Sequence, residues 1–560
     1  MAYAITRSCC NDATCVAVCP VNCIHPAPDE PGYATAEMLY IDPQTCIDCG
    51  ACVDVCPVEA IHPDFELEGA DERYLEVNAR YYDDPATADY PSARPKVVLA
   101  PLQLDQPQPL RVAIVGSGPA GCYAAEALLN RKGLNVDVHL YERLPAPWGL
   151  VRYGVAPDHP TTKEVAAQFT KMAARNGLSM HLNVEVGTHL THDDLLAHHH
   201  AVIYASGAAH DRQLAIAGED LPGSHSATDF VGWYNGHPDH AHRTFNLSSE
   251  RAVIVGNGNV ALDVARILTL PAEALARTDI AEHAMQALTD SAITEVVVLG
   301  RRGAQHASFT TPELLALSTT DGIDVVVDEP HTLPDPAHIE DPIVRLKVEI
   351  LHEIGARAPS GAAKRIRLRF LTSPVEMLGT DRVTGVRVTR NELVTDAAGT
   401  VRAHATDATD LIETGLVLRS VGYQATPVAG VPFDEATATL PNVEGRVVDP
   451  TSEAPLSGVY AAGWLKRGPS GGIGTNKACA ARTVALLIDD YIAGRLNEPG
   501  TDRDALIALI DSRQPEALTF ADWQVIDKHE RSTRPRGPRQ KITTIDEMLS
   551  VVRKRQEVLQ

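Results

Sequence analysis

Nine of the eleven cysteines in this 560-residue chain lie within its first 56 residues. They end in the run Cys46-Ile-Asp-Cys49-Gly-Ala-Cys52-Val-Asp-Val-Cys56-Pro57. In this spacing three thiolates hold one iron–sulfur cluster, and the fourth cysteine, which precedes proline, ligates a second cluster. Upstream, Cys15 and Cys19 form the other half of the same arrangement, because Cys19 also precedes proline. The sequence therefore predicts a two-cluster ferredoxin domain over residues 1–65.

Two other uses of clustered cysteines fit this pattern less well. A disulfide framework suits a small secreted domain, whereas this chain has no hydrophobic signal segment before the cysteines and continues far beyond them. Structural zinc sites favour two CxxC pairs with a long spacer rather than a triple followed by x3-C-P. Iron–sulfur ligation is the interpretation that the spacing favours.

The two halves of the cysteine pattern differ, because the first half has the adjacent pair Cys9 and Cys10 and no complete triple. This resembles the seven-iron bacterial ferredoxins, in which one site keeps three cysteines and holds a 3Fe-4S cluster. The resemblance implies two ligand sets: Cys19, Cys46, Cys49 and Cys52 for a 4Fe-4S cluster, and Cys15, Cys56 and either Cys9 or Cys10 for the other. We assign Cys9 to the second set and leave its cluster open between 3Fe-4S and 4Fe-4S. Cys23 matches a non-ligand position and is expected to be a buried thiol.

The charge balance narrows the choice of partners. The net charge of −24 argues against nucleic acid. Residues 1–65 contain nine acidic residues and one basic residue, Arg7, which makes a net charge of −8. This surface is interpreted either as ordinary solvated charge or as a docking face for redox partners. There is no run of about 18 apolar residues, so no membrane insertion is expected. Thiolate-bound clusters favour the reducing cytoplasm.

Residues 66–109 are expected to form a connector. Six prolines fall between residues 85 and 109, a density that favours extended and semi-rigid chain. Tyr74, Tyr81 and Tyr82 are large for a free tether, so part of the connector is expected to pack on its neighbours.

The pattern then changes to α/β. The apolar strand 111–115 leads into Gly116-Ser-Gly118-Pro-Ala-Gly121, a helix over 122–130 and a second strand over 136–141 that ends at Glu142. The glycines of such a turn allow the backbone to approach a pyrophosphate, which sits at the helix N-terminus. The acid accepts hydrogen bonds from ribose hydroxyls, so this site is predicted to take a dinucleotide with an unphosphorylated ribose.

A second copy follows. The strand 251–255 leads into Gly256-Asn257-Gly258-Asn259-Val260-Ala261 and a helix over 262–268. The next strand, 295–299, ends in Gly300-Arg301-Arg302 instead of an acid. Two guanidinium groups at this position suit a 2′-phosphate, so the second site is predicted to bind NADP. The alternative interpretation is that both arginines are ordinary surface charges.

Together these sites require a third redox group. NADPH gives up a hydride, whereas iron–sulfur clusters take one electron at a time, and a flavin can do both. The first nucleotide site is therefore predicted to hold FAD. The sequence argues against a disulfide-reducing flavoenzyme, because Cys122 and Cys479 are the only cysteines beyond the ferredoxin and form no CxxC or CxxxxC pair.

Residues 110–560 resemble adrenodoxin reductase and its bacterial ferredoxin–NADP reductase relatives. The resemblance rests on three stretches: Trp148-Gly-Leu-Val-Arg-Tyr-Gly-Val-Ala-Pro-Asp-His159, Gly256-Asn-Gly-Asn-Val-Ala-Leu-Asp-Val-Ala-Arg266 and Ala462-Gly-Trp-Leu-Lys-Arg-Gly-Pro-Ser-Gly-Gly-Ile-Gly-Thr-Asn476. With the ferredoxin in front, the whole chain is similar to the actinobacterial fusion form of this family.

The resemblance implies specific site residues. The expected FAD contacts are the Gly116–Gly121 turn, which includes Ala120, and residues outside it: Glu142, Leu150, Val186, Trp464, Gly471, Gly472 and Ile473. The expected NADP contacts are Arg212, Asn257, Gly258, Asn259, Val260, Arg301, Arg302, Glu313 and Gly471. His159, which follows Asp158, matches the histidine near the flavin, and we assign both to the catalytic site. The family often has an acid where this chain has Ala316, so no proton relay is expected there.

The expected architecture is an α+β ferredoxin domain of the βαββαβ type followed by an α/β flavoprotein with two dinucleotide-binding domains. The boundaries we expect are 1–65 for the ferredoxin, 66–109 for the connector, 110–210 for the first part of the FAD domain, 211–429 for the NADP domain, and 430–560 for the rest of the FAD domain with the C-terminal segment. The expected function is NADPH-dependent ferredoxin reductase activity, with electrons passing to the fused ferredoxin or to an external one-electron acceptor protein. The alternative is a non-catalytic electron-relay subunit of a larger complex.

Overall fold

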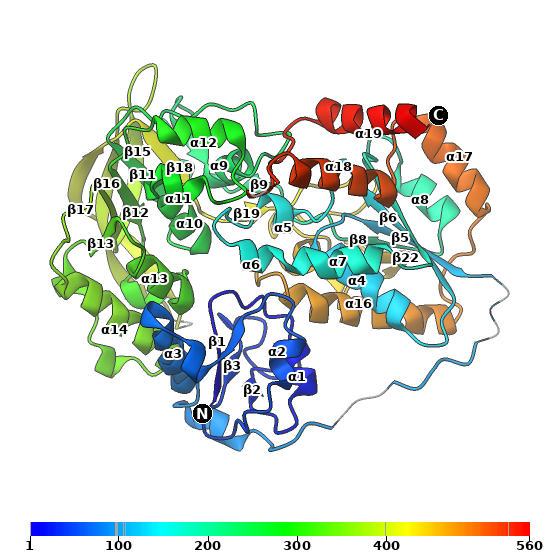
Figure 1. Cartoon of the computed structure of the whole chain (residues 1–560), viewed down its shortest axis with the longest axis horizontal. Helices are drawn as coiled ribbons and strands as arrows, with labels where there is room; N and C mark the ends of the chain where they lie inside the picture. Colours follow the sequence, from blue (N-terminus) through cyan, green and yellow to red (C-terminus); the bar gives the residue numbers. More distant parts are fainter. Residues whose placement is uncertain are drawn as a thin grey trace.

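The computed structural model describes residues 2–95, 99–104, 106, 108–397, 399–535 and 537–559. Figure 1 shows two large α/β lobes side by side, with the N-terminal domain below the junction between them. The lobe on the left contains the middle of the chain, and the lobe on the right combines residues from before and after it. Among the described residues, no helix has both the length and the apolar composition needed to cross a bilayer.

The N-terminal domain has the element order β-α-β-β-α-β that the sequence predicts for a ferredoxin. Its elements are β1 (Tyr3–Ile5), α1 (Thr14–Val18), β2 (Ile24–His25), β3 (Tyr40–Ile41), α2 (Ala51–Asp54) and β4 (Ile61–Pro63). β1 pairs with β4 and β2 with β3, both antiparallel. The two short helices each begin directly before a cysteine, at Thr14 and at Ala51.

The next segment differs from the extended connector that we expected. It forms a helix, α3 (Arg73–Tyr81), which packs on β1 and β3 of the ferredoxin domain and on α14 (Pro342–Ala356) of the left-hand lobe. Tyr74 is buried, and the Tyr82 hydroxyl donates to the carbonyl of Tyr40 at 2.8 Å. Only the later part of the segment lacks helices and strands, and residues 96–98, 105 and 107 within it lie outside the described residues.

The right-hand lobe is built on a seven-stranded sheet with the order β20-β21-β22-β8-β5-β6-β7. Its strands are β5 (Leu110–Val115), β6 (Val136–Glu142), β7 (Leu178–Leu182), β8 (Ala201–Tyr204), β20 (Asn442–Val443), β21 (Arg446–Val448) and β22 (Pro455–Ala461). β5 pairs in parallel with β6 and β8, and its residues from Val112 to Ile114 have no exposed surface. Continuous apolar strands of this kind are typical of parallel sheets that are covered on both faces.

The helices of this lobe come from both halves of the chain. They are α4 (Pro119–Asn130), α5 (Leu150–Tyr153), α6 (Pro160–Lys163), α7 (Val165–Ala173), α8 (His192–His198), α15 (Trp464–Arg467), α16 (Thr475–Ile492), α17 (Arg503–Arg513), α18 (Phe520–Ser532) and α19 (Ile545–Leu559). α4 packs along α16, which joins the two halves. The C-terminal segment closes over α5 through a buried ion pair in which Arg152 lies 2.6 Å from Glu530.

The left-hand lobe has a six-stranded parallel sheet with the order β10-β18-β11-β12-β14-β13. Its strands are β10 (Ser224–Ser226), β11 (Arg251–Val255), β12 (Glu295–Leu299), β13 (Ile323–Val327), β14 (Lys364–Arg369) and β18 (Leu416–Arg419), and β15 (Thr372–Leu378), β16 (Gly385–Thr395) and β17 (Val401–Glu413) form a separate antiparallel sheet. The helices are α9 (Ala227–Tyr234), α10 (Asn259–Thr269), α11 (Ala272–Leu275), α12 (Glu282–Thr289), α13 (Thr311–Ser318) and α14 (Pro342–Ala356). The chain enters and leaves this lobe through the paired strands β9 (His210–Asp211) and β19 (Tyr423–Gln424).

Candidate functional site

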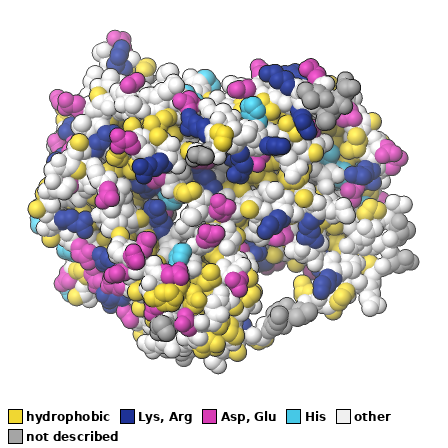
Figure 2. All heavy atoms as spheres, viewed as in Figure 1, with side chains coloured by type: hydrophobic (Ala, Val, Ile, Leu, Met, Phe, Trp, Pro, Cys, Tyr) yellow, Lys and Arg dark blue, Asp and Glu magenta, His cyan; other side chains and the backbone are white. Residues whose placement is uncertain are grey.

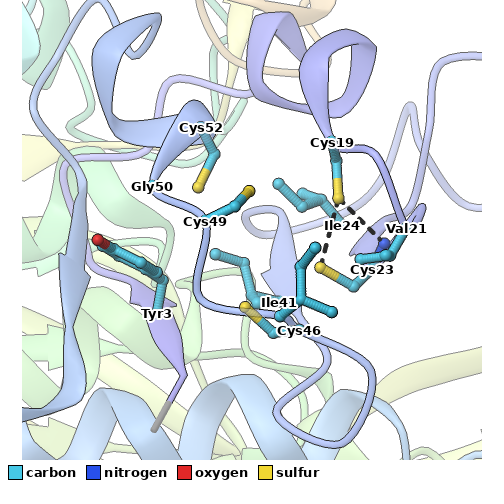
Figure 3. Close-up of a pocket in the computed structure, with 11 residues that line it drawn as sticks. Tyr3, Cys19, Val21, Cys23, Ile24, Ile41, Cys46, Cys49, Gly50 and Cys52 are labelled. Carbon is cyan, nitrogen blue, oxygen red and sulfur yellow. Dashed lines mark hydrogen bonds between the residues drawn. The ribbon is translucent and has the colours of Figure 1, made fainter.

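The outer cluster site is a small cavity in the ferredoxin domain. It is lined by Cys19, Cys46, Cys49 and Cys52, which are the four cysteines expected for a 4Fe-4S cluster, and by Cys23. Figure 3 shows the five sulfur atoms around one space, with Tyr3 on the side of Gly50. A set of thiols that converge on an enclosed space, and come from separate loops, fits a thiolate-ligated cluster.

Cys23 lies beside this ligand set. Its sulfur is 3.4 Å from the sulfur of Cys19. A hydrogen bond from the Cys23 thiol lowers the pKa of Cys19, so Cys19 more readily becomes the thiolate that binds iron. Cys23 itself is 4% exposed, as expected for a buried thiol.

The inner cluster site is expected at Cys15, Cys56 and either Cys9 or Cys10. Burial raises the pKa of the Cys9 thiol to about 12 and that of Cys15 well above its ordinary value. Thiols in such surroundings lose their protons only when a cation takes up the charge, which fits a metal cluster here. The Cys15 thiol interacts electrostatically with Cys9 and Cys56. The Cys10 thiol also interacts with Cys9 and Cys56, and it lies near Tyr123 of α4.

The inner cluster site lies directly against the right-hand lobe. The backbone N–H of Gly474 donates to the carbonyl oxygen of Cys10 at 2.6 Å. A Cβ atom added at Gly474 would lie 2.1 Å from the backbone nitrogen of Asp12, so this close approach requires glycine. Gly474 follows directly on Gly471, Gly472 and Ile473, the loop expected at the flavin. The cysteine loop and the flavin loop are thus in backbone contact.

Ion pairs hold the ferredoxin domain on both lobes. Lys477 on α16 lies 3.0 Å from Asp12, which is 5% exposed at its side chain. Lys347 on α14 lies 2.6 Å from Glu37, and this lysine is also 5% exposed at its side chain. The other carboxylate oxygen of Glu37 accepts from the backbone N–H of Thr311, at the first turn of α13. Buried charges of opposite sign at an interface fix the register of the two surfaces.

The first nucleotide turn has the backbone that a dinucleotide requires. Gly116 has a φ of 106°, and a Cβ there would lie 2.6 Å from the carbonyl oxygen of Ala205. A Cβ at Gly121 would lie 1.9 Å from the carbonyl of Gly116, so the helix packs against the turn. By contrast, nothing lies within 4 Å of a Cβ built at Gly118, which leaves room for a pyrophosphate at the start of α4. At the end of β6, the Glu142 carboxylate accepts from the hydroxyl of Ser117 at 2.6 Å.

The other residues expected at FAD lie on the same edge of the sheet. Gly149 approaches the turn, since a Cβ there would be 3.0 Å from the Cα of Gly118, and Leu150 follows it at 37% exposure. Gly463 lies so close to Ala120 that an added Cβ would be 2.6 Å from its side chain. The indole of Trp464 donates to the carbonyl of Ser470 at 3.1 Å, which ties it to the flavin loop. Val186 is half-buried in the loop after β7, beyond Leu182.

The second nucleotide turn repeats this geometry. Gly256 has a φ of 112°, and a Cβ there would lie 2.1 Å from the carbonyl oxygen of Ser420. At Gly258 the nearest atom to an added Cβ is 3.9 Å away, so this turn is also open. The Asn259 side chain accepts from the backbone N–H of Thr310 at 2.8 Å, which connects the turn to the start of α13. Asn257 and Val260 belong to the same turn.

The two arginines expected at the 2′-phosphate follow β12, as the sequence predicts. Arg301 is exposed and Arg302 half-buried. Within the part of the chain that the structure describes, neither guanidinium forms an ion pair with a carboxylate, so both are free to meet an anion. Arg212 is also exposed, and its backbone N–H donates to Gly422 between the two lobes.

His159 belongs to a buried cluster of charges. Its Nε2 lies 3.2 Å from Asp263 and its Nδ1 3.9 Å from Glu313. Burial raises the pKa of Glu313. Burial acts in the same direction on Asp158 and Asp263, but Arg266 and His159 together outweigh it, and both pKa values are lowered.

Arg266 decides what this cluster can hold. His159, Asp263 and Glu313 offer three ligand atoms within 4.8 Å of one another, which is the spacing of a metal site. Arg266 already bridges them, however, since its guanidinium lies 2.7 Å from Asp263 and 2.5 Å from the imidazole. A cation in this place argues against a metal and for a hydrogen-bonded polar cluster.

Sequence reasoning missed Asp263 and Arg266 as members of this site. Both lie within the stretch Gly256–Arg266, but only its nucleotide turn was assigned a role. The available signal was their spacing, because charges three residues apart share one face of a helix that is otherwise apolar.

Comparison with known proteins agrees with this geometry. The family model described as pyridine nucleotide-disulphide oxidoreductase matches residues 110–302, and the model described as 4Fe-4S binding domain matches residues 39–62. The chain is therefore a flavoprotein of the two-dinucleotide-domain class with an iron–sulfur domain.

The full-length relatives define the family. A "Probable ferredoxin/ferredoxin--NADP reductase" of Mycobacterium tuberculosis is 48% identical over 98% of this chain and 95% of its own length. "NADPH-ferredoxin reductase FprA" of the same organism is 44% identical over 79% of this chain and 99% of its own length. The structure titled "Mycobacterium tuberculosis FprA in complex with NADPH" has a TM-score of 0.76 at 43% identity, and covers 80% of this chain and 100% of that one. The chain belongs to the ferredoxin–NADP reductase family, in the form with a fused ferredoxin domain.

Proposed function

We propose that this protein is an NADPH–ferredoxin oxidoreductase that carries its first ferredoxin within the same chain. The observation that carries the proposal is the hydrogen bond from Gly474 to Cys10, since it joins the flavin loop to the inner cluster site. The relatives named as NADPH-ferredoxin reductases support the donor and the acceptor class.

The proposal assigns the cofactors to the sites described above. FAD occupies the turn at Gly116–Gly121, NADP the turn at Gly256–Ala261 with Arg301 and Arg302, and two iron–sulfur clusters the outer and inner cluster sites. When bound, these groups supply hydride acceptance and one-electron transfer. We propose a 4Fe-4S cluster for the outer site. For the inner site we propose Cys9 as the third ligand, because Cys15 interacts with Cys9 and Cys56, although Cys10 also interacts with Cys56. Its nuclearity, 3Fe-4S or 4Fe-4S, is left open.

The chain's own residues position the donor and screen it from water. Arg301 and Arg302 bind the 2′-phosphate by charge-assisted bonds, and the open backbone at Gly258 receives the pyrophosphate. The backbone N–H groups of Gly472 and Ile473 would stabilise the end of the bound flavin where negative charge develops. His159 is held by Arg266 and Asp263 at the border of the lobes, and its role is to orient the reacting rings.

Hydride transfer itself needs no general acid, which agrees with Ala316 at the position where the family often has an acid. Since thiolate-ligated clusters require reducing conditions, we propose the cytoplasm as the compartment.

The test is an anaerobic titration of the purified single chain with NADPH, followed by visible absorption and by electron paramagnetic resonance. We expect flavin bleaching together with the signal of at least one reduced cluster. If the flavin and the clusters are present but inert towards NADPH without a partner protein, the relay-subunit alternative holds instead.

A further inference from the structure

The outer cluster site opens onto solvent through a patch of apolar residues. Cys49 is the one exposed cysteine of the eleven, all of which the structure describes. Ile47 beside it is 58% exposed, and Val18 and Val53, on α1 and α2, are each 37% exposed. Figure 2 shows hydrophobic side chains gathered over this domain, with acidic ones beside them. We call Val18, Ile47, Cys49 and Val53 the outer face. Large exposed apolar groups that adjoin one another mark sites of protein contact.

The charged residues next to the outer face in the chain are negative. Asp48 and Asp54 are exposed and directly adjoin Ile47 and Val53 in the chain. The basic residues of the described residues 2–95 are engaged elsewhere. Arg73 and Arg80 form ion pairs with Glu353 and Glu349 of α14.

The remaining two arginines are also directed away from the outer face. Arg94 pairs with Asp29 and Glu30. Arg7 lines a cavity of about 550 Å³ between the ferredoxin domain and the two lobes, together with Asp158 and Arg266. Asp48 and Asp54 therefore form no ion pair with these four arginines, and the outer face combines exposed apolar side chains with two exposed acids, which we call its acidic rim.

We propose that the outer face is the docking surface for an external electron-acceptor protein that presents an apolar patch ringed by lysine and arginine. Charge complementarity selects this partner over a second copy of the chain, because the same acidic rim on both copies repels. The inference rests on the proposed function and extends it, since it names the exit for electrons and the chemistry of the acceptor.

The electron balance of the outward step is simple. One NADPH is oxidised to NADP⁺ with release of one proton, and its two electrons reduce two molecules of a one-electron acceptor, each of which docks in turn. No further oxidant or reductant is required. An apolar centre with a charged rim suits such sequential docking, because the rim raises the association rate while the complex stays short-lived.

The test uses cytochrome c as a basic one-electron acceptor, and measures its binding to the oxidised holoprotein by surface plasmon resonance. The variant Asp48→Asn with Asp54→Lys changes the charge of the outer face by +3. The matched control, Asp381→Asn with Glu435→Lys, makes the same change at exposed positions of the reductase lobes. We expect the outer-face variant to raise the Kd at least tenfold at low salt, with the control within twofold, and the difference to disappear near 0.5 M NaCl. Equal losses in both variants, or no loss, would overturn the proposal.

A second variant separates apolar contact from long-range attraction. Ile47→Ser leaves the charge unchanged and should raise the dissociation rate several-fold, and an unchanged dissociation rate would contradict the apolar centre.

Sedimentation of the wild type tests the competing occupant, because dimers that the outer-face variant alters would assign this surface to self-association. Cluster reduction by NADPH, followed by electron paramagnetic resonance, is measured in every variant. If it fails in the wild type, the proposed function fails. If it persists while cytochrome c binding is insensitive to these changes, only the docking proposal is refuted.

Discussion

The inner and outer cluster sites share one type of cysteine motif but lie in opposite surroundings. At the inner site, Cys10 accepts a backbone hydrogen bond from Gly474 and Asp12 pairs with Lys477, so the loop is covered by the reductase. At the outer site, Cys49 is exposed among apolar side chains. The cysteine spacing predicts where clusters bind, whereas the surface around each site carries our proposal for the partner with which it exchanges electrons. One site faces the flavin loop and the other faces solvent.

The largest expected effect comes from breaking the outer site. Cys52→Ala removes a ligand of the outer cluster and should lower NADPH-driven cytochrome c reduction by roughly 100-fold, because the cluster is lost with its ligand. The NADPH reduction rate of the flavin, measured by stopped-flow absorption, should stay within about twofold. Cys23→Ala is the matched comparison, since it alters the same cavity but keeps all four assigned ligands, and it should cost much less than Cys52→Ala. A parallel loss of flavin reduction in Cys52→Ala would show that the two functions are not separable.

The second effect concerns the electron input and leaves both cluster sites intact. Arg301→Ala with Arg302→Ala removes charge-assisted bonds worth about 2 kcal/mol or more, so KM for NADPH should rise roughly 30-fold or more. NADH lacks the 2′-phosphate, and its KM should change by less than about twofold. Arg365→Ala, at an exposed arginine of the same sheet, serves as control. Equal increases for NADPH and NADH would refute the 2′-phosphate assignment.

A smaller effect is expected from loosening the inner site's attachment. Glu37→Gln leaves the buried Lys347 without its counter-charge, which weakens docking of the ferredoxin domain. We expect cluster reduction by NADPH to slow by about tenfold, and hydrogen exchange of α3 to increase. Asp54→Asn changes an exposed acid of the same domain and should affect neither quantity. Unchanged exchange in Glu37→Gln would mean that this ion pair does not hold the domain in place.

The smallest expected effect is at a partly exposed ion pair of the inner site. Lys477→Met removes the partner of Asp12 but retains the apolar stem, and the lysine is 31% exposed at its side chain. Pairs of this kind contribute about 1 kcal/mol or less, so cluster reduction should slow two- to fivefold. The difference from the wild type should shrink as salt is added, and a difference that is independent of salt would point to a packing effect instead.

The sequence predicts the elements around the two nucleotide turns almost to the residue. The expected strand 295–299 is β12, and the expected strand 251–255 is β11. These segments combine an apolar run with a glycine turn, so local sequence and tertiary environment favour the same structure.

The helix α3 was not predicted, although part of its signal is local. The prolines of the expected connector all fall at residue 85 or later, so they do not bear on residues 73–81, where the buried residues Tyr74, Val77 and Asn78 recur at helical spacing. The sequence does not show its packing on β3 and α14 or its ion pairs, such as Arg73 with Glu353. These partners lie 280 residues apart, and no local pattern encodes such a contact. The same limit applies to Glu37 with Lys347 and to Gly474 with Cys10, whose meaning appears only once the domains are placed together.

The most direct test of the account compares which cluster NADPH can reduce when the other is removed. Cys15→Ala disrupts the inner cluster and Cys52→Ala the outer one, and dithionite reduction verifies by electron paramagnetic resonance that the remaining cluster is present. If the inner site is the entry from the flavin, NADPH should reduce the inner cluster in Cys52→Ala, but should reduce the outer cluster in Cys15→Ala at least about 100-fold more slowly than in the wild type. Reduction of the outer cluster at the wild-type rate in Cys15→Ala would contradict the order of sites that the structure indicates.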